Sequence, residues 1–210
     1  MLNEMTSAIA DRSITYPIVE TFHSVQGEGH HTGVSAFFIR LGGCDVHCPW
    51  CDTKESWNAK RHPQRTVQEL AEEVKQARSA IAIITGGEPL MHDLTPLTIA
   101  IREQGISVHL ETSGSHSFSG EFDWVTFSPK QFLAPHRSIY SHVNELKVVI
   151  VNEYDFKWAE QQAALVPPET IKYLQPEWST AKSKDLIFNY VLKHSQWRIS
   201  LQTHKLLQVR

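Results

Sequence analysis

The chain has 210 residues, of which 41% are hydrophobic and 20% are charged, a composition typical of one soluble globular domain. Its formal net charge is −3, and no run of Lys and Arg residues is longer than two. The chain therefore lacks the positive stripe that binding to duplex nucleic acids requires, which disfavours a nucleic-acid partner. No apolar stretch approaches the ~18 residues of a membrane-spanning helix, and residues 1–16 lack the basic start and apolar centre of a secretory signal. We therefore predict a cytoplasmic protein without a membrane anchor, with residues 1–16 as an N-terminal extension and residues 17–210 as a single domain.

Apolar strand patterns alternate with helical patterns along the chain. In the first helix Thr66 and Glu69 form a capping box, while the second helix has Pro96 at its start and Gly105 after its end. In chain order, the expected elements are strand 37–41, helix 66–78, strand 81–84, helix 96–105, strands 106–112, 124–127 and 145–151, helix 154–165, strand 171–174, helix 183–194 and strand 197–201.

Strands that are apolar throughout and separated by helices indicate a parallel sheet covered by crossover helices. About six such units are too few for a closed eight-unit barrel of ~250 residues, so an open sheet or an incomplete barrel is expected. In either arrangement functional side chains collect at the carboxyl ends of the strands. Polar segments do follow four of the strands, namely a cysteine-containing loop after residue 41 and residues 85–89, 111–114 and 128–130.

The cysteines of the chain are Cys44, Cys48 and Cys51, an odd number at close spacing that is typical of a metal or redox site. A redox dithiol would use Cys48 and Cys51, but Cys44 would compete as a disulfide partner. A structural zinc site would need the adjacent residues His47 and Cys48 to converge on one ion. An iron–sulfur cluster takes thiolate ligands, and three cysteines on a four-iron cluster leave one iron open to a small molecule.

The spacing Cys44-x-x-x-Cys48-x-x-Cys51 resembles the signature of the radical S-adenosylmethionine (SAM) superfamily, and Thr85-Gly86-Gly87-Glu88-Pro89 resembles its SAM-binding strand end. After Tyr16, essentially the whole chain is similar to the 7-carboxy-7-deazaguanine synthase family. The motifs that carry this second resemblance are residues 24–29, 38–41, 51–53, 111–114, 128–130 and 197–205. The resemblance implies an α/β radical SAM fold, an incomplete TIM-type barrel of about six parallel strands.

The resemblance also implies an activity, the conversion of 6-carboxy-5,6,7,8-tetrahydropterin to 7-carboxy-7-deazaguanine with loss of ammonia, in 7-deazapurine (queuosine) biosynthesis. The implied cofactors are a 4Fe-4S cluster, SAM and Mg²⁺. In this family SAM is cleaved to a radical that takes hydrogen from the substrate and later returns it, because such ring contraction has no accessible polar route. An electron donor such as flavodoxin and a homodimer are implied in the same way.

Carried over residue by residue, the resemblance makes Cys44, Cys48 and Cys51 the cluster ligands and Thr53 the protein ligand of Mg²⁺. Outside this context Thr53 would read as a helix N-cap. The implied SAM-contacting residues are Trp50, Cys51, Asp52, Gly86, Gly87, Glu88, Ser128, Pro129 and Lys130. Packing against the cluster is an alternative role for Trp50. No catalytic residue is expected beyond the ligands of the cofactors and the substrate.

Arg40 lies in a strand that is otherwise apolar and suits bidentate recognition of the substrate carboxylate. Gln26 and Glu28 can pair with the polar edge of a pterin ring, since unmatched polar groups in a closed pocket are costly. The full implied substrate set is Val25, Gln26, Gly27, Glu28, Arg40, Thr85, His204 and the chain-terminal Arg210. Two alternatives stay open at this point, a glycyl-radical enzyme activating enzyme and a zinc-stabilised binding module.

Overall fold

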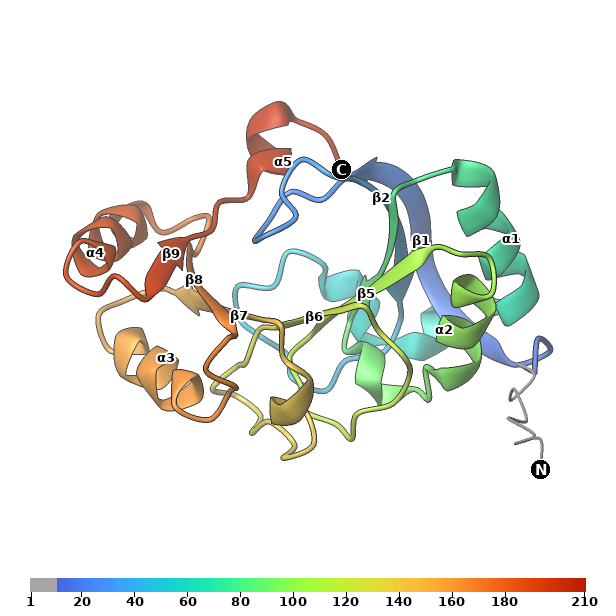
Figure 1. The fold of residues 1–210 in the computed structure, drawn as a ribbon, viewed down its shortest axis with the longest axis horizontal. Coiled ribbons are helices and arrows are strands. Elements are labelled where there is room, and N and C mark those ends of the chain that lie inside the picture. Colours follow the sequence, from blue (N-terminus) through green and yellow to red (C-terminus); the bar gives the residue numbers. More distant parts are fainter. Residues whose placement is uncertain (1–10) are drawn as a thin grey trace, which may run out of the picture.

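The structure is a computed structural model that describes residues 11–210. Its strands form one mixed sheet in the order β3-β1-β2-β4-β5-β6-β7-β8-β9 (Figure 1). The strands are β1 (Thr15–Val25), β2 (Ser35–Leu41), β3 (Gln64–Thr66), β4 (Ile81–Gly86), β5 (Ser107–Thr112), β6 (Trp124–Phe127), β7 (Glu145–Ile150), β8 (Ile171–Pro176) and β9 (Trp197–Ile199).

Strands β2 and β4 to β9 run parallel to one another, while β1 is antiparallel to β2 and β3 is antiparallel to β1. The sheet begins at β3 and ends at β9, and these two edge strands do not pair with each other. The expected α/β fold with an incomplete barrel is therefore confirmed. The boundary predicted between residues 16 and 17 falls inside β1, and most of the segment before it lies outside the described residues.

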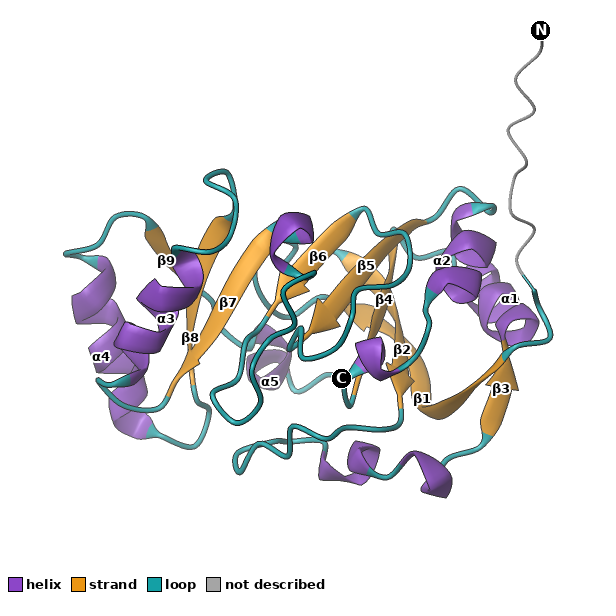
Figure 2. Cartoon of the chain, turned by 90° about the horizontal axis from the view of Figure 1, so that it is seen from below, coloured by secondary structure: helices purple, strands orange, loops and turns teal. Residues whose placement is uncertain are grey.

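Helices α1 to α4 cover one face of this sheet, with α1 and α2 over one half and α3 and α4 over the other (Figure 2). Along β7 the side chains of Leu146, Val148 and Ile150 join the apolar core on the helix side, whereas Lys147 and Val149 face a cavity on the other side. The helices are α1 (Val67–Ala77), α2 (Thr95–Arg102), α3 (Asp155–Ala163), α4 (Ala181–Val191) and the short α5 (Thr203–Leu207).

Local signals in the sequence start and stop these helices as expected. The hydroxyl of Thr66 accepts from the Glu69 backbone N–H, and the Glu69 carboxylate accepts from the Thr66 N–H, which completes the capping box of α1. Pro96 lies in the first turn of α2, and Gly105 follows that helix with a φ of +75°. Among the described residues, no helix has both the length and the apolar character needed to cross a membrane.

Candidate active site

A cavity of about 590 Å³ opens at the carboxyl ends of the parallel strands, opposite the helical layer. All the residues predicted for the cluster, SAM, Mg²⁺ and the substrate line this cavity, with the exception of Pro129. Pro129 lines a smaller neighbouring cavity of about 290 Å³, which shares Trp50 and Lys130 with the main one. Segments far apart in the sequence thus meet around one space, as the topology of parallel strands requires.

The cysteine loop leads from the end of β2 to the 3₁₀ helix η1 (Lys54–Trp57). Its three cysteines are free, and backbone N–H groups point at two of the sulfurs. The N–H of Thr53 lies 3.4 Å from Cys51 Sγ, and the N–H groups of Val46 and His47 hydrogen-bond the Cys44 sulfur. Amides that converge on sulfur stabilise thiolates, so the loop fits a thiolate-bound cluster.

The same loop does not fit the two other readings of the cysteines. A redox dithiol would pair Cys48 with Cys51, but Cys44 is free in the same loop and would compete as a disulfide partner. His47, the fourth ligand of a zinc site, packs its ring on Trp57 with the centroids 4.7 Å apart. Within residues 11–210, no three or more His, Cys, Asp or Glu side chains are arranged around a single-ion site.

The glycine pair at the end of β4 allows the strand to touch the cysteine loop. The Gly87 N–H donates to the Leu41 carbonyl at 2.9 Å, and the Glu88 N–H donates to the Gly43 carbonyl at 2.7 Å. A Cβ on Gly87 would lie 2.1 Å from that Gly43 oxygen, and a Cβ on Gly86 would lie 2.2 Å from the Leu41 oxygen. Only glycine permits this approach, which places the predicted SAM-binding strand end beside the cysteines.

Glu88 is buried, with 1% of its surface exposed, and its carboxylate joins the ends of two strands. One oxygen accepts from the Leu90 N–H at 3.0 Å and from the Thr112 hydroxyl, and the other accepts from the N–H of Ser113 at 2.8 Å and from its hydroxyl. Hydroxyl hydrogens can rotate, so a ligand ammonium can take their place without moving the carboxylate. The predicted role of Glu88 toward the methionine ammonium is compatible with these contacts and stays a prediction.

The ends of β5 and β6, together with Trp50 of the cysteine loop, complete the predicted SAM wall. The Ser128 N–H donates to the Thr112 carbonyl at 2.8 Å, which joins the ends of β5 and β6. The ammonium of Lys130 donates to Ser128 Oγ at 2.5 Å and lies 5.4 Å from the centroid of the Trp50 ring. Trp50 is therefore held by a cation–π contact at the cavity wall.

Thr53 occupies the N-cap position of η1, but its side chain makes no capping hydrogen bond. Its hydroxyl donates instead to Asp52 Oδ1 at 3.2 Å, which leaves the hydroxyl oxygen free to ligate a hard cation. The other oxygen of Asp52 accepts from Lys205 at 2.9 Å. Burial alone would raise the pKa of Asp52, but the hydrogen bond and charge of Lys205 lower it. The helix-cap interpretation of Thr53 is thus not supported, and the donor set fits Mg²⁺.

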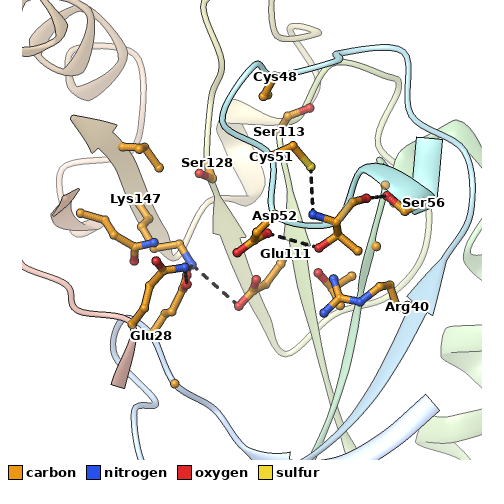
Figure 3. Close-up of a pocket in the computed structure, with 18 of the residues that line it drawn as sticks. Glu28, Arg40, Cys48, Cys51, Asp52, Ser56, Glu111, Ser113, Ser128 and Lys147 are labelled. Carbon is orange, nitrogen blue, oxygen red and sulfur yellow. Dashed lines mark hydrogen bonds and ion pairs between the residues drawn. The ribbon is translucent and has the colours of Figure 1, made fainter. Parts of the chain in front are cut away.

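One end of the cavity is acidic. Lys147 Nζ lies 2.5 Å from Glu28 Oε2 and 3.8 Å from Glu111 Oε1 (Figure 3). Gln202 donates to the other oxygen of Glu28 at 2.9 Å, and Gln26 donates to Glu111 Oε1 at 2.7 Å. The two carboxylates outnumber the single lysine, so this end offers acceptors to a ligand that carries N–H groups.

The other end of the cavity presents guanidinium groups. Arg40 Nε donates to Glu20 Oε1 at 3.0 Å, and Arg210 Nη1 lies 2.5 Å from Glu20 Oε2. Both guanidinium carbons lie near the face of Phe22, at 6.0 Å and 5.7 Å from the ring centroid. Within residues 11–210, no hydrogen bond uses the two terminal nitrogens of Arg40, so they are available to a carboxylate.

The C-terminal residues close the wall between these two ends. The backbone N–H and the hydroxyl of Thr203 both donate to the Gly27 carbonyl at 2.9 Å. His204 lies so close that a Cβ on Gly27 would come 2.1 Å from its Nδ1. Helix α5 therefore lies beside the β1–β2 loop (Figure 1) and brings His204 to the cavity next to Glu28.

Several cavity residues were not predicted from the sequence. Lys147 carried the same signal as Arg40, a charged side chain within an apolar strand pattern, and could have been found in that way. Glu111 and Lys205 lie in the motifs 111–114 and 197–205 but were given no role of their own. Trp178 stands in a loop without a distinctive local pattern, although Lys205 Nζ lies 5.2 Å from the centroid of its ring. The cavity residues that were given no predicted role include Glu20, Phe22, Glu111, Lys147, Trp178, Gln202 and Lys205.

Comparison with known proteins places this geometry in context. A family profile described as the radical SAM superfamily matches residues 38–127. A 7-carboxy-7-deazaguanine synthase from Synechocystis sp. is 56% identical over 198 residues, which cover 94% of this chain and 95% of the relative. A relative of the same name from Flavobacterium psychrophilum is 43% identical over the full length of both chains. The crystal structure of QueE from Escherichia coli superposes with a TM-score of 0.80 at 32% identity, covering 90% of this chain and 94% of that chain.

Proposed function

Because the chain belongs to the 7-carboxy-7-deazaguanine synthase family of the radical SAM superfamily, we propose that it converts 6-carboxy-5,6,7,8-tetrahydropterin to 7-carboxy-7-deazaguanine. The reaction releases ammonia and is a step of 7-deazapurine (queuosine) biosynthesis. The two alternative functions give way to this assignment. A glycyl-radical enzyme activating enzyme and a zinc-stabilised module are both at odds with close relatives that span nearly the whole chain.

The observation that carries the proposal is the polarity of the cavity. Glu28 and Glu111 supply acceptors on one side of the cavity, Arg40 supplies donors on another, and the cysteine loop lines the same cavity (Figure 3). A carboxylated pterin has N–H groups on its pyrimidine edge and a carboxylate at the far end of the molecule. The cavity therefore pairs both ends of such a substrate and leaves the reacting ring facing the cysteines.

The residues of this chain hold the cofactors and exclude water, while the cofactors supply the radical chemistry. Cys44, Cys48 and Cys51 would hold the 4Fe-4S cluster, and Thr53 would ligate Mg²⁺. When bound, the cluster and SAM supply the radical that abstracts hydrogen from the substrate. The strand-end residues Gly86, Gly87, Glu88, Ser128 and Lys130, with Trp50 and Asp52, form the wall proposed to fix SAM against the cluster.

The substrate side of the same cavity has an orienting role. Arg40 is proposed to bind the carboxylate, and Gln26 and Glu28 the pyrimidine edge, with Val25, Gly27, Thr85, His204 and Arg210 completing the wall. A ring held at both ends keeps a fixed orientation relative to the SAM wall. Orientation of this kind is the main contribution that a protein makes to radical catalysis.

Turnover of the pterin tests this function directly. Protein reconstituted anaerobically with iron and sulfide is mixed with SAM, Mg²⁺, a reductant and 6-carboxy-5,6,7,8-tetrahydropterin, and the products are separated by chromatography and identified by mass spectrometry. We expect 7-carboxy-7-deazaguanine and ammonia in equal amounts, without net loss of SAM. A brown protein that cleaves SAM but forms none of this product would contradict the proposal. The Cys48→Ser variant serves as the control for product formed without an intact cluster.

Removing the Thr53 hydroxyl tests the proposed Mg²⁺ site. In Thr53→Ala the Mg²⁺ concentration that gives half-maximal rate should rise by ~10-fold or more, because the cation loses its protein ligand. Thr53→Ser keeps the hydroxyl and should respond as the unaltered protein does. Iron content and the visible spectrum should not change in either variant, since Thr53 holds no iron. A magnesium response that is the same in both variants would remove Thr53 from this role.

We further propose, from the family resemblance, that a flavodoxin-like protein donates the electron and that the chain forms a homodimer in the cytoplasm. The exposed apolar side chains at the β9 edge and on α5 support a protein–protein contact, because exposed apolar clusters of this kind are typical of interaction surfaces. These side chains are Ile199, Leu201, Leu206, Leu207 and Val209. The formal charge of −3 gives no reason to expect a nucleic-acid partner.

A further inference from the structure

Lys147 is a buried lysine in the middle of a strand. It has 4% of its surface exposed, and it lies on β7 between Leu146 and Val148, whose side chains enter the apolar core. Strand alternation turns Lys147 to the opposite face, toward the cavity. None of the sequence motifs that indicate the function includes this residue. A lysine in such a position has lost its water and needs compensating partners.

Three carboxylates compensate the charge of Lys147. Burial alone would lower the pKa of Lys147, but the charges of Glu111, Glu28 and Glu145 raise it above its usual range. Burial would likewise raise the pKa of Glu28, which Lys147 and Gln202 instead hold well below its usual range. The lysine and Glu28 therefore stabilise each other's charged form. With one cation beside the two cavity carboxylates Glu28 and Glu111, the acidic end of the cavity retains acceptor capacity.

The unused acceptors face the cavity. Both oxygens that bind Lys147 belong to cavity-lining residues, as do the side chains of Gln26 and Gln202 that hold the same carboxylates. Within residues 11–210, no hydrogen bond uses Glu111 Oε2. Each oxygen of Glu28 has one recorded polar partner and can accept a second hydrogen bond. Glu28, Glu111, Gln26 and Gln202 thus belong to the cavity wall, while Glu145 lies buried behind it.

Stability alone does not account for such a group. A buried ion pair is often matched or exceeded in stability by well-packed apolar residues of similar volume, because of the desolvation cost of both charges. Val149, the next residue of β7 on the cavity face, is apolar, so this face of the strand does not require a charge at every position. The presence of Lys147 is therefore better explained by an effect on the ligand of the cavity than by an effect on stability.

We propose that Lys147 is a specificity-determining positioning residue, which holds the carboxylates of Glu28 and Glu111 side by side as acceptors for the adjacent ring N–H and amino groups of a 2-amino-4-oxopyrimidine. This role deepens the proposed function and rests on it. A ring that carries a carbonyl in place of the 2-amino group places a carbonyl oxygen next to the two carboxylates. This oxygen cannot donate a hydrogen bond to them, so such a ring should bind more weakly. Lys147 selects the ligand through its neighbours, and it is not required to touch the ligand itself.

Equilibrium binding separates this role from catalysis. The reconstituted protein with SAM but without reductant is titrated with pterin-6-carboxylate and with lumazine-6-carboxylate, which differ in the 2-amino group, in an isothermal titration calorimeter. We expect the unaltered protein to prefer the pterin by ~10-fold or more, because hydrogen bonds to a charged acceptor would be lost with the lumazine. In Lys147→Met the pterin affinity should fall by ~10-fold while the lumazine affinity changes little, so the preference disappears.

Two variants and one control guard against a purely structural explanation. Lys147→Arg keeps the positive charge and should keep a preference for the pterin. The double variant Lys147→Met/Glu28→Gln removes the unpaired carboxylate along with the lysine, so it should fold even if the single variant does not, and it should still lack the preference. Lys172→Met places the same substitution on the adjacent strand β8, outside the cavity, and should leave both affinities unchanged.

Each outcome bears on the proposal. A pterin preference that survives in Lys147→Met or in the double variant would overturn the positioning role, as would an unaltered protein that binds both ligands equally. Failure of the pterin turnover assay in a protein that retains the binding preference would instead count against the proposed reaction. Cluster content and thermal unfolding are measured for every variant, so a loss of preference is interpreted only in folded protein.

Discussion

Replacing Gly87 with alanine should reduce turnover by ~100-fold or more and lower the iron content of the reconstituted protein. The added Cβ would lie 2.1 Å from the Gly43 carbonyl oxygen and 3.0 Å from Cys44 Cβ. The first is a backbone atom of the cysteine loop, and the second is bonded directly to that backbone. Neither atom can move without shifting the loop. Displacements of about 1 Å in an active site cost on the order of 100-fold in rate. Iron and sulfide analysis, SAM cleavage and product formation measure the effect.

Gly105→Ala is the matched control for this prediction. Gly105 has a positive φ, of +75°, and a Cβ there meets nothing within 4 Å. The substitution should therefore cost roughly 1 kcal/mol of stability through backbone strain and leave turnover unchanged. If Gly87→Ala were to load a full cluster and turn over normally, the close approach of β4 to the cysteine loop would have no functional importance.

Replacing Arg40 with methionine should lower kcat/KM for the pterin by ~100-fold or more, mainly through a higher KM. The two terminal guanidinium nitrogens are the donors proposed for the substrate carboxylate, and hydrogen bonds between charged groups contribute about 1.5–3 kcal/mol each. The affinity for SAM should not change, since Arg40 is not among the residues proposed to fix SAM. Steady-state kinetics with varied pterin, together with SAM binding, measure both quantities.

Arg40→Lys separates charge from geometry at this position. A lysine keeps the positive charge and loses the planar pair of donors, so its kcat/KM should fall between those of the methionine variant and the unaltered protein. A KM for Arg40→Met within threefold of the unaltered value would assign carboxylate recognition to another group, of which Arg210 is the nearest by position. Substitution at Arg40 leaves Arg210 paired with Glu20, so the wall itself should persist.

The parallel part of the sheet could be predicted because its strands are short, apolar runs bounded by turn residues. Strands β1 and β3 were missed for the opposite reason. Only Tyr16 to Ile18 of β1 are fully buried, and the rest of the strand, including Glu20 and His23, is polar or half exposed without regular alternation. Strand β3 reads Gln-Arg-Thr and forms only through its pairing with β1. Tertiary contact, rather than local pattern, makes these residues strands.

The site likewise contains residues that a local sequence pattern reveals and residues that only tertiary contact brings together. The cysteine loop and the glycine pair are local motifs, in which the chemistry requires certain residues at a fixed spacing, so a single sequence reveals them. The contacts of Lys147 are different, because its partner Glu28 lies 119 positions away. No local pattern can report that a lysine and a glutamate at such a separation share one cavity wall. The charged residue within an apolar strand was the one available sign.

The wall between α5 and the β1–β2 loop has a consequence for the maturation of the protein. It joins Gln202 to Glu28 and Thr203 to Gly27, pairs that are 174 and 176 positions apart. Contacts at such separation form late, because a long loop must close before they contribute any stability. The cysteine loop and the end of β4 are much closer in sequence and can assemble first. We therefore expect the newly made chain to expose its cysteine sulfurs through the side that this wall later closes, which gives iron and sulfide a route of entry before the pocket is complete.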